Sequence, residues 1–208
     1  MNKIKMIHTS ISVIHEEHAS LSAMLYSLRL MIEKGMEDQP AVFFDVLRAM
    51  IFYIDEVPEK QHHTKESELL FPAIARRTDD GGELISQLES DHRQGEKAVR
   101  ELQHKLLAWE ILGESRRKEF EEKADLYIDF YLNHIRLEEK YLIPQALKVL
   151  TAADWKELDK AFEKNSDPMS QQQPRDPVYD RLFTKIVMHT PEPIGLGSTL
   201  RQRQFDAH

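Results

Sequence analysis

Four long segments of the chain carry apolar residues three and four positions apart, the spacing of an amphipathic helix. They span about Ile4 to Lys34, Pro40 to Arg77, Glu83 to Leu112 and Ser115 to Val149. The connections between them are short, so neighbouring helices must run antiparallel. The sequence therefore predicts an all-α fold, an up-down-up-down four-helix bundle.

The pattern changes after Leu150, where we expect a short extra helix and a C-terminal tail. Thr151 is a typical cap for the helix TAADWKELDKAF, whose aromatic residues would pack on the bundle. NSDPMSQQQPRDP follows as a polar linker, Val178 to Met188 predict one more amphipathic helix, and the rest to His208 is expected to be mostly irregular. We assign residues 1–150 to the bundle, and residues 151–208 to an extension packed on the bundle or on a partner.

A histidine and glutamate pattern occurs twice in the chain. HHTKESELLFP, from His62, aligns with HIRLEEKYLIP, from His134: each has Glu four residues after His and Pro ten residues after it. Upstream, HEEHASL around His18 aligns with ESDHRQG around His92, and the intervals to the later histidines are 44 and 42 residues. The chain therefore resembles two helical hairpins that carry the same set of polar groups.

Helix geometry brings these groups together. Residues i and i+4 lie on one helix face, so each His-x-x-x-Glu aims two donors the same way. The four histidines lie at similar distances from the turns of their hairpins, hence at one level of the bundle. Without a cation their burial would cost several kcal/mol. We therefore predict a metal centre with six ligands: His18, His62, Glu66, His92, His134 and Glu138.

Six donors exceed the four of a closed zinc site. Two metals, bridged by Glu66 and Glu138 and each completed by two histidines, would use every group. The alternative is that these are scattered core or surface residues, which is usual for a lone histidine. A duplicated pattern at matched depth argues against that alternative.

Several other residues near these motifs are weaker candidates. Glu96 follows His92 by four residues and is a possible seventh ligand or hydrogen-bond acceptor. His63 points about 100° away from His62 in an α-helix, so we expect it at the rim or behind the ligands. His15 is expected on the helix surface and Tyr127 in the core. His8, His104, His189 and His208 have no matching partner and no expected role.

Pro58 and Ser115 each support a prediction about local helix structure. Pro58, four residues before His62, predicts a kink next to the metal centre. Ser115 is a candidate cap for the fourth helix.

Composition excludes several classes of protein. A net charge of −8 argues against a nucleic-acid binder. No apolar run is long enough for a membrane span, the N-terminus lacks the pattern of a signal peptide, and a cytoplasmic location is the default expectation. The chain has no cysteine, so disulfides and thiolate metal sites are ruled out.

Taken together, these motifs resemble those of the hemerythrin-like, HHE cation-binding domain family. The motifs that carry the resemblance are EEH ending at His18, HHTKE followed by LLFP, DH ending at His92, and HIRLEE followed by LIP. The resemblance continues through LTAADWKELDKAF and implies a four-helix bundle with two non-haem iron ions, bridged by carboxylates and an oxo or hydroxo group. It implies the same six ligands and an exchangeable position for a small diatomic ligand or peroxide. True oxygen carriers have another histidine at the position of Glu96 and use the carboxylate at that of Glu139, which argues against reversible oxygen carriage here.

Three functions remain open at this point. The first is a protein that binds or senses O₂, NO or peroxide, or handles iron under oxidative or nitrosative stress. The second is an enzyme that reduces peroxide or NO at the same centre, and the third is a storage module for iron or another metal. We favour a metal-binding or sensing protein over a dedicated enzyme, and the sequence leaves the oligomeric state open.

Overall fold

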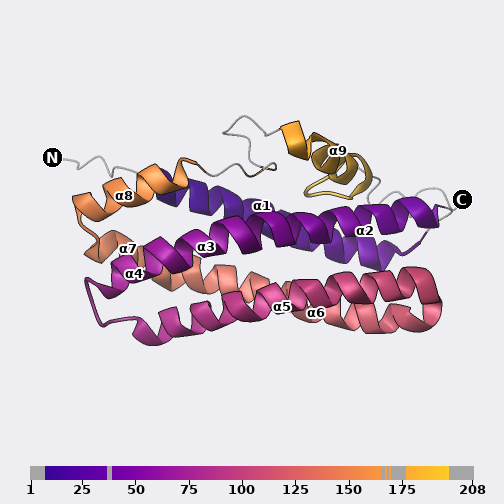
Figure 1. The fold of residues 1–208 in the computed structure, drawn as a ribbon, viewed down its shortest axis with the longest axis horizontal. Coiled ribbons are helices and arrows are strands. Elements are labelled where there is room, and N and C mark those ends of the chain that lie inside the picture. Colours follow the sequence, from indigo (N-terminus) through magenta and orange to yellow (C-terminus); the bar gives the residue numbers. More distant parts are fainter. Residues whose placement is uncertain (1–7, 37–38, 165–166, 168, 170–176, 197–208) are drawn as a thin grey trace, which may run out of the picture.

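The computed structural model describes residues 8–36, 39–164, 167, 169 and 177–196. All regular structure in these ranges is helical, which confirms the all-α class. Four long helical segments make up most of the fold, the second and fourth of them interrupted by π-helical turns (Figure 1). The first is α1 (Thr9–Lys34) and the third is α5 (Gly82–Leu112). The second comprises α2 (Pro40–Ile54), η1 (Asp55–His62), α3 (His63–Lys65), η2 (Glu66–Leu70) and α4 (Phe71–Ala75).

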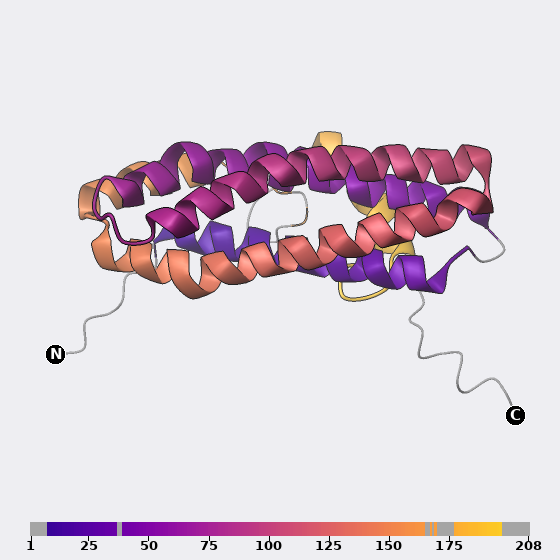
Figure 2. The same cartoon turned by 90° about the horizontal axis from the view of Figure 1, so that it is seen from below.

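The fourth segment comprises a 3₁₀ turn η3 (Glu114–Arg116), α6 (Arg117–Leu137), η4 (Glu138–Leu142) and α7 (Ile143–Val149). The long segments lie side by side and close into a ring, because α1 contacts α2 and α6 while α5 contacts α2 and α6 (Figures 1 and 2). None of the described helices combines the length and apolar character that crossing a membrane requires.

The core is divided into two apolar clusters along the length of these segments. The larger one lies toward the α1–α2 connection and includes Leu28, Leu47, Leu106 and Phe120. The smaller one lies toward α8 and includes Ile14, Phe71, Leu142 and Phe162. In every long segment the predicted ligands fall between residues of the two clusters, so apolar packing seals that level of the bundle from both ends.

The π-helical turns coincide with the repeated motifs. η2 begins at Glu66 and η4 begins at Glu138, and a proline follows each of them, Pro72 and Pro144. Proline lacks the N–H that continues an α-helix and crowds the carbonyl four residues before it, and a wider turn accommodates both effects. Pro58 lies inside the π-helix η1, so the chain stays helical there, and the kink expected at this proline stays a prediction.

The C-terminal part places two further helices on the α1–α2 side (Figure 1). α8 (Ala152–Phe162) begins with a capping box in which Thr151 Oγ1 accepts from the Asp154 N–H and Asp154 accepts from Thr151. Trp155 and Phe162 are buried in the smaller cluster against α1. A 3₁₀ turn η5 (Pro177–Tyr179) leads into α9 (Asp180–His189), close to the range predicted for an amphipathic helix. This helix packs against α2.

Two further local predictions concern the cap at Ser115 and the polar linker after α8. Ser115 does not cap the fourth segment, because it lies inside η3, and Arg116, which precedes α6, makes no side-chain capping bond. Asp167, from the predicted linker, is buried and accepts a hydrogen bond from the Tyr53 hydroxyl at 3.1 Å. The predicted start at Ile4, most of the linker and the tail from residue 197 to His208 lie outside the described residues.

Thr151 and Ser115 form a matched pair for a test of capping. We expect Thr151→Ala to lower the free energy of unfolding by about 1 kcal/mol, because the Asp154 N–H loses its acceptor. Ser115→Ala should change it by less than about 0.5 kcal/mol. Urea denaturation of the metal-free variants, followed by circular dichroism, measures both. Equal effects of the two substitutions would contradict the assignment of the cap.

Candidate metal centre

The structure brings the six predicted ligands together at one level of the bundle. They come from all four long segments: His18 from α1, His62 and Glu66 from the second, His92 from α5, and His134 and Glu138 from the fourth. All six are buried; the most exposed is His92 at 7%, while His134 and Glu138 are at 0%. A large substrate has no room to reach these groups.

The donors form two overlapping groups, each compact enough to hold one metal ion. One group consists of His18, His62, Glu66 and Glu138, and the other of His92, His134 and the same two carboxylates. Within the groups, the Nε2 atoms of His18 and His62 lie 3.2 Å apart, and those of His92 and His134 lie 3.1 Å apart. The four imidazoles therefore direct Nε2 toward the centre.

Each carboxylate lies between the two histidine pairs. Glu138 Oε2 is 3.1 Å from His18 Nε2, and Glu138 Oε1 is 3.4 Å from His134 Nε2. Glu66 Oε2 is 3.4 Å from His62 Nε2 and 3.6 Å from His92 Nε2. Both carboxylates thus face one histidine of each pair, the arrangement that bridging two cations requires.

The outer nitrogen of every one of these histidines has an oxygen partner. Glu17 accepts from His62 Nδ1 at 2.7 Å and Glu139 accepts from His18 Nδ1 at 2.7 Å. In the second hairpin, His134 Nδ1 lies 3.4 Å from Asp91 Oδ2. Such partners fix the ring orientation and leave the Nε2 lone pair for a metal.

The residues that contact the Nδ1 atoms of the four histidines follow the same pattern in both hairpins. His92 Nδ1 lies 2.9 Å from Ser67 Oγ. In each hairpin the acidic residue before the first histidine supports the second one: Glu17 supports His62 and Asp91 supports His134. The residues after Glu66 and Glu138, Ser67 and Glu139, each support a histidine of the other hairpin. The sequence motifs contain all four supporting residues, although spacing alone does not say which histidine each one contacts.

A buried network of another kind lies beside His63. Of the two predicted places for His63, at the rim or behind the ligands, the structure shows the second: His63 is 3% exposed, because His92 and Tyr131 cover it with near-parallel rings, at centroid distances of 4.3 and 5.3 Å. Glu59 accepts from His63 Nδ1 at 3.2 Å. The same carboxylate accepts hydrogen bonds from the hydroxyls of Tyr127 at 2.9 Å and Tyr131 at 2.6 Å.

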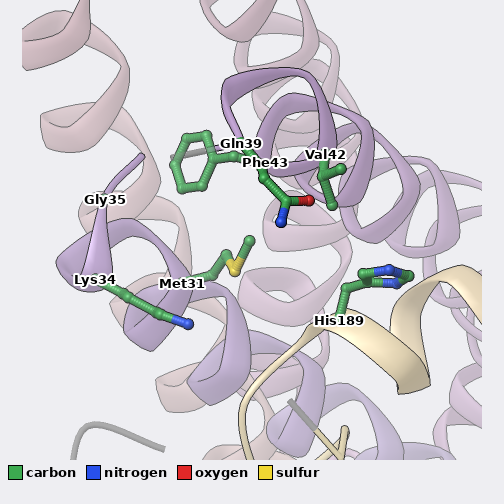
Figure 3. A pocket seen from close by; sticks show the side chains of 7 residues that line it. All are labelled: Met31, Lys34, Gly35, Gln39, Val42, Phe43 and His189. Carbon is green, nitrogen blue, oxygen red and sulfur yellow. The ribbon is translucent and has the colours of Figure 1, made fainter. Parts of the chain in front are cut away.

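The other residues considered as candidates from the sequence belong to neither of the two donor groups. Glu96 is not near the donors but is exposed and pairs with Arg100 at 2.5 Å. His15 lies on the surface, as predicted, and reaches Glu139 at 2.8 Å. His189 lines a cavity of about 230 Å³ where α1 ends and α2 begins, together with Lys34 and Gln39 (Figure 3). None of the six predicted ligands lines that cavity.

Burial and the neighbouring charges shift the pKa values of the clustered histidines and carboxylates. Burial alone would lower the pKa of His18, but Glu138 and Glu139 raise it to about 10. Burial also opposes protonation of His134, and Glu138 and Asp91 raise its pKa to about 10. The pKa of Glu66 rises to about 8 because the group is buried beside the charge of Glu138. Glu66 also raises the pKa of His62 against the effect of burial, whereas burial lowers the pKa of His92 to about 3.

The burial of unpaired oxygens indicates that these residues fit a metal. Within the described part of the chain, the buried side-chain atoms without a hydrogen-bond partner are Asp55 Oδ1, Glu66 Oε2 and both carboxylate oxygens of Glu138. Three of these four atoms belong to the two shared carboxylates. A buried carboxylate without a partner costs free energy that coordination to a cation recovers.

Metal binding should release protons, since a metal and a proton compete for the same Nε2 atoms. From the raised pKa values of His18, His134 and Glu66 we expect between two and three protons to be released at pH 7. Affinity should then rise with pH by roughly tenfold per pH unit for each proton released, up to about pH 8 for the proton of Glu66 and up to about pH 10 for those of His18 and His134. Calorimetric titration with Co²⁺ in buffers of different ionisation enthalpy counts the protons. Binding without proton release would contradict the assignment of these groups as ligands.

The family comparison agrees with this geometry. No curated protein matches the chain. The family model described as the hemerythrin HHE cation binding domain matches residues 9–146, a range that contains all six donors and both copies of the repeat. The match covers more than half of the chain, so this protein belongs to the hemerythrin HHE cation-binding domain family.

Proposed function

We propose that the protein holds two non-haem iron ions and uses them to bind or sense O₂, NO or peroxide, or to handle iron under oxidative or nitrosative stress. In this proposal His18 and His62 bind one ion, His92 and His134 bind the other, and Glu66 and Glu138 bridge them. The four long segments then form the up-down-up-down four-helix bundle that their short connections favour.

The observation that carries the proposal is the sharing of both carboxylates between two compact donor groups. A single ion would leave one histidine pair without a partner. Imidazole and carboxylate donors suit iron, and bundles that present them from facing helices are the usual hosts of carboxylate-bridged di-iron centres. Both arguments favour two irons over one tetrahedral zinc.

When bound, such a pair of ions supplies redox chemistry and exchangeable positions for small ligands. The protein's own residues orient the imidazoles and exclude water. The partners of the Nδ1 atoms hold the imidazoles in place, and the two apolar clusters keep bulk water out. Because all six donors are buried, a ligand of two or three atoms suits the site better than an organic substrate.

The contacts of Glu139 bear on the choice between sensing, iron handling and reversible oxygen carriage. Its Oε1 accepts from His18 Nδ1 and, at 2.8 Å, from His15 Nδ1, so it supports a ligand and leaves bridging to Glu138. Together with the outward position of Glu96, this supports sensing or iron handling over reversible oxygen carriage. The alternatives are reduction of peroxide or NO, which turnover with an electron donor would reveal, and storage of iron or another metal.

Metal content tests the proposal directly. Protein purified under reducing conditions should contain about two irons per chain and develop absorption between roughly 320 and 500 nm in air. His62→Ala and His134→Ala should each lose at least one iron, while His104→Ala, at an exposed position of α5, should retain both. Zinc in place of iron, or no iron after reconstitution, would refute the di-iron proposal.

A further inference from the structure

A groove on the outside of the bundle lies where α9 packs on α2 (Figure 1). Its volume is about 580 Å³, and its lining residues fall within 45–52 of α2, 103–107 of α5 and 178–185 of η5 and α9. We refer to it as the α9 groove. None of the six predicted metal ligands lines it, so it is a feature separate from the metal centre.

One wall of the α9 groove comes from a part of the chain outside the family match. Residues 9–146 include α2 and α5, whereas α9 begins at Asp180. α9 adds little to the core of the bundle, because Ile186 is the one buried residue of this helix. Val178 and Leu182 line the groove instead. The C-terminal extension therefore turns an outer face of the bundle into a concave surface.

The lining of the α9 groove leaves large apolar side chains open to solvent. Phe52 of α2 is 47% exposed, Leu107 of α5 is 48% exposed and Val178 of η5 is 75% exposed. Contact of these side chains with water is unfavourable, and an apolar ligand that covered them would remove it. Exposed apolar side chains from three segments that line one hollow indicate a binding surface.

The α9 groove is positively charged, although the chain has a net charge of −8. Its lining contains three cations, Arg48, Arg181 and Lys185, and a single carboxylate, Asp45. Asp45 accepts from Arg48 at 2.9 Å and also pairs with Lys185, so its charge is already matched. Within the described part of the chain, no carboxylate pairs with Arg181, which is exposed and lies one helical turn before Lys185. The groove thus combines an apolar lining with one available cation.

We propose that the α9 groove binds an aliphatic monocarboxylate of the fatty-acid type. The apolar tail lies on Phe52, Leu107 and Val178, and the carboxylate pairs with Arg181. The volume of about 580 Å³ falls in the range of about 300 to 1,000 Å³ that small-molecule sites occupy. A guanidinium suits this head group, because it binds a carboxylate through two parallel hydrogen bonds. A cationic amphiphile would instead meet three like charges.

Calorimetric titration of the full chain with sodium decanoate, below the concentration at which it forms micelles, tests this assignment. Wild type should bind one decanoate per chain, and Arg181→Gln should bind it at least about tenfold more weakly, because the carboxylate loses its charged partner. Arg76→Gln is the matched control, since Arg76 is an exposed arginine at the end of α4 that does not line the groove. Decyltrimethylammonium, which has the same tail and the opposite charge, should bind at least about tenfold more weakly than decanoate. Equal affinity for the two amphiphiles, or equal affinity of wild type and Arg181→Gln, would overturn the proposal.

Leu107→Asn tests the apolar wall separately. Leu107 is half exposed, so the variant should fold, which circular dichroism checks, and its affinity for decanoate should fall by roughly fivefold because the tail loses apolar contact. Unchanged affinity would overturn the placement of the tail. Absence of decanoate binding to wild type would overturn the proposal as a whole. A dimer in sedimentation that Leu107→Asn dissociates would then assign the groove to a second copy of the chain, and binding to phosphatidylglycerol vesicles would assign it to a membrane surface.

Discussion

Two carboxylates buried side by side impose the central constraint on this bundle. Glu66 and Glu138 are 1% and 0% exposed, and three of their four oxygens have no neighbour able to donate except the Nε2 atoms of the four histidines, which lie 3.1 to 3.6 Å away. Two such charges in an apolar interior repel each other and lose their hydration, so positive charge must accompany them. Protons on His18 and His134 can supply it, because neighbouring carboxylates, Glu138 first among them, raise the pKa of both imidazoles to about 10 against the effect of burial. Two cations would supply it more completely, because they bind the same oxygens and histidine nitrogens at once.

The rest of the centre follows from this constraint. An imidazole can meet a cation only if Nε2 is unprotonated and correctly directed, so the opposite nitrogen needs an acceptor. Residues adjacent to the ligands provide these acceptors: Glu17 and Asp91 precede His18 and His92, and Glu139 follows Glu138. Since neighbours in a helix face different directions, each acceptor reaches a histidine on another segment. The supporting contacts therefore also tie the four segments to one another at the level of the centre.

The sequence predicts the symmetric part of the site well. Equal His-x-x-x-Glu spacing and nearly equal intervals within the hairpins place six donors at one level, and these depend only on helical rise and rotation. The asymmetric part could not be predicted in this way. Whether His63 and Glu96 face inward depends on how α5 and α6 are rotated against the second segment and on the π-helical turn over Asp55–His62. The role of Glu59 depends on Tyr127 and Tyr131, about seventy residues away, and on the space left by Gly95. Ser115 shows the same limit locally, since a 3₁₀ turn displaces it from the capping position.

The two sides of the centre also differ in their access to solvent. On the side of His63 the contacts run through Glu59 to Tyr127 and Tyr131, both of which are buried. On the side of His18 the chain of contacts runs outward through Glu139, whose side chain is 32% exposed, to His15, which is 47% exposed. The supporting contacts of His18 therefore reach the surface through Glu139 and His15, whereas the contacts of His63 are made with buried side chains.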